Sequence, residues 1–557
     1  MRSSGLLIAV ASVAAVAAFA GGVGAQLRDS TQNTDIIGTT GHPAVPAGIN
    51  LSYAQEQGSS PDTHGDELMV GSSRYLIARD PGRAVRRGRQ LFQRKFTQAQ
   101  GLGPLTSDGL GSTGADLSRS AGFADSCAGC HGRPKGAAGS GGDVATRPDS
   151  RDAPHLFGLG LQEQLADEIT SDLRGIRDAA VVEAAARHRA VTKTLSSKDV
   201  SYGAITVQAN GSIDTSTVVG VNADLRVRPF FAQGGTVSIR EFVVGALNAE
   251  MGLESPDSDL ISAQTSRVVT PAGMVLDGTK DFVENSPAAD TTADPDGDGV
   301  KDEVPVAIVD FLEFYLLNYF KPAAGKQTDQ ALLGRAAFSA IGCASCHVPN
   351  MKIEHDRRIA DLETVYDPLQ GNPFNNLFAT ATLLVSPNPS FPAIEGSPGG
   401  LMPTRGSFLV RNFFADLKRH DLGANFYERN YNHNVAQVSP RVEPPHDPAT
   451  NFTTQFMTEP LWGVGDTAPY GHDGRSGTLD DVILRHGGEA MDARNRYARL
   501  APVVQGWLQD FLRTLVLFGP DDTASTLNPK NEAAAGYPQV GHGSIALGAI
   551  FTTPGPE

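Results

Sequence analysis

Two short stretches constrain this chain more than any others. Cys127 to His131 and Cys343 to His347 both read C-x-x-C-H, and together they use all 4 cysteines. Two thiols one helical turn apart can add to the two vinyl groups of one porphyrin, and the histidine that follows can then coordinate the iron. A zinc site or a redox dithiol would explain one C-x-x-C, but not two copies that both end in histidine. The sequence therefore predicts two covalently bound c-type haems, attached at Cys127, Cys130, Cys343 and Cys346 and ligated by His131 and His347.

A similar pentapeptide precedes each motif. Gly88 to Phe92 reads GRQLF and Gly334 to Phe338 reads GRAAF. Because each copy lies upstream of a C-x-x-C-H, we interpret the chain as an internal duplication of two cytochrome-c-like domains. The first copy also has an insertion between the pentapeptide and the cysteines, which either shapes a pocket beside the haem or decorates the surface.

Apolar periodicity predicts a mainly α fold with two cytochrome-c-like haem domains, long loops and minor β pieces. Helices are expected at 84–96, 239–253, 306–320, 329–340 and 503–517. The expected organisation is a signal peptide at 1–25, a polar N-terminal arm at 26–83, an N-terminal c-type haem domain at 84–300, a C-terminal c-type haem domain at 301–520 and a flexible tail at 521–557.

The N-terminus indicates export. Arg2 precedes an apolar run from Leu6 to Ala20, and small residues follow up to Ala25. This pattern is typical of a cleaved secretory signal, whereas an uncleaved anchor would need a longer run. We therefore expect a periplasmic or secreted protein without stable membrane insertion, in the compartment where c-type haem is attached in bacteria. With 46 Lys+Arg against 62 Asp+Glu and a net charge of −16, a nucleic-acid partner is not expected. The expected partner is an electron donor or acceptor in the same compartment.

A candidate sixth ligand lies near the C-terminus. Thr478 and Asp481 form a capping-box pattern at the start of a helix. On this helix Leu479, Ile483 and His486 share one face by the i, i+4, i+7 rule. An inward-facing histidine is ordinarily a hydrogen-bonded core residue, but beside an iron that needs a sixth ligand we favour axial ligation by His486.

The first haem offers three candidates for proton transfer. The apolar segment 153–161 runs into a polar stretch, and together they contain His155, Glu163 and Glu168. A peroxidase needs a carboxylate or imidazole above the iron to move a proton between the peroxide oxygens. For each of the three, a solvated helix face or a satisfied buried side chain is an equally good interpretation.

An acidic loop suggests a cation. Asp294, Asp296, Asp298, Val300 and Asp302 stand at alternate positions in a glycine-containing loop, which suits Ca²⁺ with oxygen ligands. Proline replaces the glutamate that ends an EF-hand loop, so we favour a calcium loop of another type over a bare acidic turn.

Proline soon follows each haem-binding histidine, as Pro134 and Pro349. A backbone carbonyl fixed near each proline could accept the histidine Nδ1–H, although ordinary turn formation would explain both prolines as well.

In combination, these motifs resemble the bacterial di-haem c-type oxidoreductases described as peroxidases or thiol oxidoreductases, which are relatives of di-haem cytochrome c peroxidase and of MauG. The resemblance rests on 88–92 with Phe96 and Thr97, 101–104, 126–131, 153–161, 342–349 and 460–490. In di-haem peroxidases the sixth ligand of the C-terminal haem follows a Pro-Tyr-x-His-x-Gly segment and is usually methionine. Here that position is His486, which implies a bis-histidine haem with a lower potential than a His/Met site. Rubber oxygenases, more distant relatives, are also thought to combine one bis-histidine haem with one open haem.

The hypothesis is therefore a periplasmic di-haem oxidoreductase. The first haem would be the reactive centre and the second an electron relay, so that the enzyme reduces H2O2 or uses a high-valent haem iron to oxidise a substrate. Alternatives are an O2-dependent oxygenase, a MauG-like enzyme that modifies a partner protein, and a non-enzymatic electron carrier with His155 or His188 at the first haem.

Overall fold

The structure is a computed structural model. It describes residues 72–79, 126–131, 152–286, 303–318, 327–357, 407–429, 452–465 and 467–516, with isolated positions and short strands between these ranges. Helices with minor strand pieces make up this part of the chain, in agreement with the predicted class. The helices are α4 (Ser73–Arg79), α6 (Cys127–His131), α8 (Leu159–Arg187), α9 (Ile239–Ala249), α10 (Ser258–Ala263), α11 (Val306–Leu317), α12 (Asp329–Ala340), α14 (Leu479–Arg485), α15 (Met491–Ala498) and α16 (Pro502–Arg513), with 3-10 turns η3 (Cys343–Ser345) and η5 (Gly488–Ala490).

The strands are short and pair antiparallel. The longest, β3 (Val191–Ser197) and β4 (Val200–Val207), form a hairpin that β5 (Ile213–Asp214) extends. Other pairs are β6 (Arg267–Val269) with β7 (Val275–Asp277), β9 (Met351–Ile353) with β14 (Phe408–Val410), β15 (Arg419–His420) with β19 (Phe456–Met457), and β8 (Ala323–Ala324) with β20 (Leu515–Val516). The remaining strands are β1 (Thr106–Ser107), β2 (Leu110–Gly111), β10 (Leu362–Thr364), β11 (Ala381–Leu383), β12 (Ser386–Pro387), β13 (Leu401–Met402), β16 (Glu428–Arg429), β17 (His446–Asp447) and β18 (Phe452–Thr453).

Helix α11 is the centre of the first hydrophobic core. All of its residues are buried, and it packs with α4, α9 and residues of the 84–96 segment. The predicted domain bounds stay predictions. Tyr75, Leu76 and Ile77 of α4, which fall in the predicted polar arm, are buried in this core. Helix α11, which falls in the predicted C-terminal domain, packs in it as well. A helix that is apolar on every side must be buried, but its sequence does not say against which neighbours.

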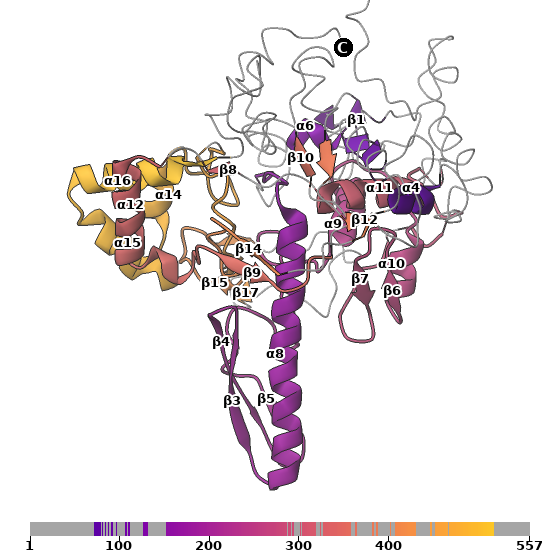
Figure 1. Ribbon diagram of the computed structural model, residues 1–557, viewed down its shortest axis with the longest axis horizontal. Helices are drawn as coiled ribbons and strands as arrows, with labels where there is room; N and C mark the ends of the chain where they lie inside the picture. Colours follow the sequence, from indigo (N-terminus) through magenta and orange to yellow (C-terminus); the bar gives the residue numbers. More distant parts are fainter. Residues whose placement is uncertain are drawn as a thin grey trace, which may run out of the picture.

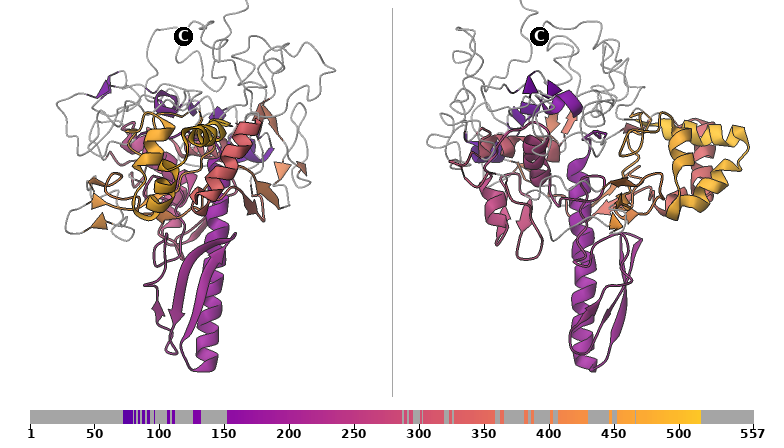
Figure 2. Two further views of the ribbon diagram at one scale, coloured as in Figure 1. Left: turned by 90° about the vertical axis from the view of Figure 1, so that its left-hand side faces the viewer. Right: turned by 180° about the vertical axis from the view of Figure 1, so that it is seen from behind.

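A second core lies under the long helix α8. The helix packs on β3, β4 and the β9–β14 pair, together with Phe413 and Trp462. Its second half projects from the body as an arm, with the β3–β4 hairpin along one side (Figure 1). Figure 2 shows the same arm from two further directions. Because α8 lies between the helices of the first core and the C-terminal helices, residues 159–166 sit at the junction of the two haem regions.

The third core holds the second C-x-x-C-H motif. Helix α12 has the predicted bounds and is capped by Thr328, whose hydroxyl accepts from the Ala331 N–H. It packs on α16, and Phe338 contacts Phe511 at 5.6 Å between ring centroids. At the end of α12 the chain turns through Gly342, whose φ of 99° lies in the left-handed region. The turn places Cys343 and Cys346 next to the core.

The two pentapeptides share a packing role. A Cβ at Gly88 would lie 2.1 Å from the Phe311 carbonyl oxygen of α11, and a Cβ at Gly334 would lie 1.8 Å from the Trp507 carbonyl oxygen of α16. Each glycine therefore allows the backbone of a second helix to approach closely. None of the helices in the described ranges combines the length and apolar character that crossing a bilayer would require.

Candidate haem sites

The first motif forms helix α6, which ends at His131. The His131 Nδ1–H donates to the Pro154 carbonyl oxygen at 2.7 Å. Because a carbonyl can only accept, this contact assigns the proton to Nδ1 and leaves the Nε2 lone pair for a metal. Burial lowers the pKa of His131, so the ring stays neutral, as ligation requires.

The second motif has the same arrangement. The His347 Nδ1–H donates to the Phe414 carbonyl oxygen at 2.9 Å, and burial lowers the pKa of His347 to about 4. The sequence analysis placed the acceptor of each histidine near the proline that follows it. The structure instead places the acceptors at Pro154 for His131 and at Phe414 for His347, so this prediction is wrong. Pro349 oxygen instead accepts from the Phe413 N–H at 2.8 Å, which fixes the segment that holds His347. Pro134 lies outside the described residues.

The cysteine chemistry argues against a dithiol. None of the four cysteines is joined in a disulfide. Burial raises the pKa of Cys127 and of Cys343 to about 12. A redox dithiol or a zinc thiolate needs the opposite shift, whereas thioether attachment buries the sulfur in an uncharged state.

His486 lies at the end of α14, as its C-cap residue. The predicted capping box is present, with Thr478 and Asp481 bonded reciprocally. The His486 Nδ1–H donates to the Val482 carbonyl oxygen at 2.6 Å, which again leaves Nε2 available. Burial lowers the pKa of His486 as well.

One cavity of about 970 Å³ joins the three imidazoles, because His131, His347 and His486 all line it. This volume is at the upper end of the range of small-molecule sites, about 300–1,000 Å³. Cys343 and Cys346 line the same cavity. Neutral imidazoles, sulfurs beside a large cavity and backbone acceptors behind each proximal ring are the donor set that covalent haem requires, so the residues present suit the predicted cofactor.

The three proton-transfer candidates are not brought together. The Glu163 carboxylate is buried and accepts from the Ile239 N–H at 2.7 Å, at the start of α9. The Glu168 carboxylate pairs with Lys198 at 2.6 Å and accepts from the His355 N–H at 2.9 Å. These contacts tie α8 to its neighbours, and neither carboxylate is among the described residues that line the cavity.

His155 does line the cavity, but on the proximal side of the first site. It follows Pro154, whose oxygen accepts from His131. His155 Nδ1 accepts from the Phe157 N–H, and its Nε2–H donates to the Trp462 carbonyl oxygen at 2.9 Å. Both ring nitrogens are used, so His155 orients the segment behind His131 and has no lone pair for iron.

Glu241 and Glu284 are among the carboxyl groups that line the cavity on the side of the first core, and the sequence analysis did not single them out. Glu241 is buried at the start of α9 and accepts from Ser238 Oγ and from the Glu284 N–H. Burial and the nearby Glu241 raise the pKa of Glu284 to about 8, so it carries a proton at neutral pH. The Ser238-x-x-Glu241 capping pattern was a visible signal for the first residue. No local signal marks Glu284.

The segment 461–475 supports both sites. Its Trp462 oxygen holds His155, and its His472 oxygen accepts from the Asp152 N–H at 2.7 Å. The Trp462 ring packs edge-on against Phe413 at 5.0 Å, next to the residue that holds His347. The segment that orients His131 and the segment that orients His347 therefore both contact Trp462.

Residues 447–515 match a family described as "Di-haem oxidoreductase, putative peroxidase". This segment contains Trp462 and His486, which both line the cavity shared by the two candidate sites. This match agrees with the predicted resemblance, and it supports haem as the cofactor and redox chemistry as the activity.

Comparison with solved structures gives only distant similarity to this chain. A hydrazine synthase chain from Kuenenia stuttgartiensis aligns with 16% identity over 38% of this chain, at a TM-score of 0.20. A MauG-like protein associated with microbial copper homeostasis aligns with 13% identity over 56% of this chain and 76% of its own, at a TM-score of 0.22. The chain spans 55% of the length of the hydrazine synthase chain. No curated protein matches the sequence.

The calcium hypothesis stays a prediction. Asp294 is described, whereas Asp296, Asp298, Val300 and Asp302 lie outside the described residues.

Proposed function

We propose that this chain is an exported, peroxidase-like oxidoreductase with two covalently bound c-type haems. Cys127, Cys130 and His131 would hold the first haem, and Cys343, Cys346, His347 and His486 the second. The observation that carries the proposal is the shared cavity, which is lined by His131 of the first motif and by His347 and His486 of the second site. When bound, the haems would supply the electron-transfer and peroxide chemistry.

The difference between the two sites supports a division of labour. At the second site both His347 and His486 point a neutral Nε2 toward the cavity, so that haem would be saturated and would relay electrons. At the first site His131 keeps its Nε2 available, whereas both nitrogens of His155 are bonded and the Nε2 of nearby His472 lies 3.2 Å from Glu428 Oε2. The first site would therefore keep an open position for peroxide.

The chain's own residues provide for proton transfer. Glu284 lies on the first core's side of the cavity and is protonated at neutral pH. Its carboxyl group can hold a proton and donate it to a peroxide oxygen in the cavity, which is the work of a general acid. Glu241, fixed by Ser238 and by the Glu284 N–H, keeps that carboxyl group in place.

The proximal residues provide for communication between the sites. A continuous path runs from His131 to the Pro154 carbonyl, through His155 to Trp462, and on to the Phe413–Phe414 segment that holds His347. Close packing and hydrogen bonds along this path would couple the two haems and hold them at a fixed separation.

The haem-loaded protein, reduced by one electron and mixed with H2O2, tests the proposal. We expect peroxide to be consumed with oxidation of the second haem, as followed by stopped-flow absorbance. If neither haem reacts with peroxide in this state, the enzyme function is wrong. A stable dioxygen complex that is inert to peroxide would show an oxygenase instead. Export rests on the apolar run from Leu6 to Ala20, and cell fractionation of the producing bacterium would test it.

A further inference from the structure

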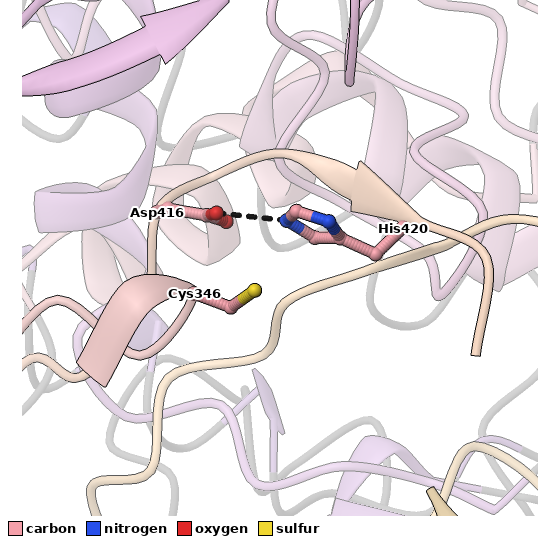
Figure 3. Close-up of side chains that lie close together, drawn as sticks. All are labelled: Cys346, Asp416 and His420. Atoms are coloured by element: carbon pink, nitrogen blue, oxygen red, sulfur yellow. Dashed lines mark hydrogen bonds and ion pairs between the residues drawn. The ribbon is translucent and has the colours of Figure 1, made fainter. Parts of the chain in front are cut away.

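His420 is held between two carboxylates beside the second C-x-x-C-H motif. Its Nε2 lies 2.8 Å from Asp416 Oδ2 and its Nδ1 lies 2.7 Å from Glu489 Oε2. The side chains of His420 and Asp416 are buried, whereas Glu489 is 52% exposed. Figure 3 shows Asp416 and His420 pointing toward each other, with the Cys346 sulfur next to them.

The geometry assigns the charge of this ring. An ionised carboxylate only accepts hydrogen bonds, so each ring nitrogen that faces one must carry a proton. His420 is therefore an imidazolium between two anions, with two charge-assisted hydrogen bonds. Burial alone would lower the pKa of His420, but its hydrogen bonds, above all the one to Asp416, raise it to about 11.

The two carboxylates belong to the segments that carry the two candidate ligands. Asp416 lies two residues after Phe414, whose oxygen accepts from His347. The Asp416 backbone oxygen also accepts from the Tyr202 hydroxyl at 2.9 Å, which anchors that segment to the β3–β4 hairpin.

Glu489 lies three residues after His486. Its N–H donates to the Asp421 oxygen at 2.8 Å, and its Oε1 accepts from the Asp421 N–H at 2.9 Å. The Gly487 N–H donates to the Leu422 oxygen at 2.9 Å. The segment after His486 is thus hydrogen-bonded to the segment after His420. The hydrogen bond from the His420 imidazolium to Glu489 joins the two segments once more.

We propose that His420 is a positioning residue that fixes both axial histidines of the second haem, by joining the segment that holds His347 to the segment that carries His486. This inference rests on the proposed bis-histidine ligation of that haem. His420 would act through its neighbours and would not touch the iron.

The same side chains could suggest a metal site, because ligand atoms of Cys346, Asp416 and His420 lie within 4.8 Å of one another. We call the hydrogen-bonded set of Asp416, His420 and Glu489 the clamp, and two features favour it over a metal site. Both nitrogens of His420 carry protons and have no lone pair to donate. Cys346 would also be a thioether in the haem-loaded protein, and a thioether is a poor ligand for most divalent metals.

Cyanide binding to the ferric, haem-loaded protein tests the clamp. In wild type we expect one haem per chain to bind rapidly, because the second has two protein ligands. Glu489→Ala and His420→Gln should let cyanide replace His486 at least about tenfold faster, which corresponds to about 1.4 kcal/mol. Glu489→Gln, which keeps one oxygen for the His420 N–H, should stay close to wild type. His355→Gln, at an exposed histidine, is the matched control.

The outcomes separate the clamp from the proposed function. If wild type already binds two cyanides rapidly, the bis-histidine assignment fails. If wild type binds one, and Glu489→Ala keeps the wild-type rate and the wild-type electron paramagnetic resonance g values, the clamp is overturned. Because Glu489 is half exposed, Glu489→Ala tests the positioning role of His420 even if His420→Gln does not fold.

Discussion

Replacing Gly334 by alanine should separate the helix that leads to the second haem from its partner. The added Cβ would lie 1.8 Å from the Trp507 carbonyl oxygen and 2.8 Å from the Leu508 nitrogen. Ordinary contacts of a Cβ are 3.4–4 Å, so α12 and α16 would have to move apart by more than an ångström. The obstructing atoms are backbone and cannot rotate away. Overpacking of this kind costs about 1–3 kcal/mol.

Gly506→Ala on α16 is the matched control, because a Cβ there would meet nothing within 4 Å. Both substitutions gain the same helix propensity, about 1 kcal/mol, so the difference between them isolates the clash. We expect Gly334→Ala to be less stable than Gly506→Ala by about 1–3 kcal/mol. The assay is denaturant unfolding of the haem-loaded protein, followed at the absorbance of the second haem. Equal stability of the two variants would refute the close packing of α12 on α16.

Three further predictions concern the sites. Glu284→Gln should reduce the rate of peroxide turnover and abolish the fall of that rate at alkaline pH. The wild-type rate should fall because Glu284, with its raised pKa of about 8, loses its proton as the pH rises through 8. An unchanged pH–rate profile would exclude Glu284 as the proton donor. His486→Ala should make the second haem high-spin, and added imidazole should restore the low-spin absorbance, whereas an unaltered spectrum would remove His486 from the ligand set. His155→Leu leaves the Trp462 oxygen without its donor and should weaken the His131 ligation, measured as a shifted iron–histidine Raman band in the ferrous protein; a band at the wild-type frequency would argue against this support.

The sequence predicted those features that depend on residues close together in the chain. The bounds of α12, the capping box of Thr478 and Asp481, and the inward position of His486 all follow from residues within two turns of one another. The two glycines were visible in the repeated pentapeptides, but the close helix packing that each allows depends on a second helix that is distant in the sequence.

Features that depend on distant contacts could not be read from the sequence. The acceptors of His131 and His347 come from residues 23 and 67 positions away, and nothing near Pro154 or Phe414 marks them. The same holds for α11, whose uniform apolarity predicts burial but not membership of the first core, and for Glu284, which reaches the cavity only through the fold.

The spin states of the two haems test the central claim most directly. Electron paramagnetic resonance of the ferric, haem-loaded protein should show one high-spin iron, at the His131 site, and one low-spin iron with the g values of bis-histidine ligation. Two low-spin irons that stay unreactive toward peroxide after half-reduction would contradict the account, because neither site would then have an open position.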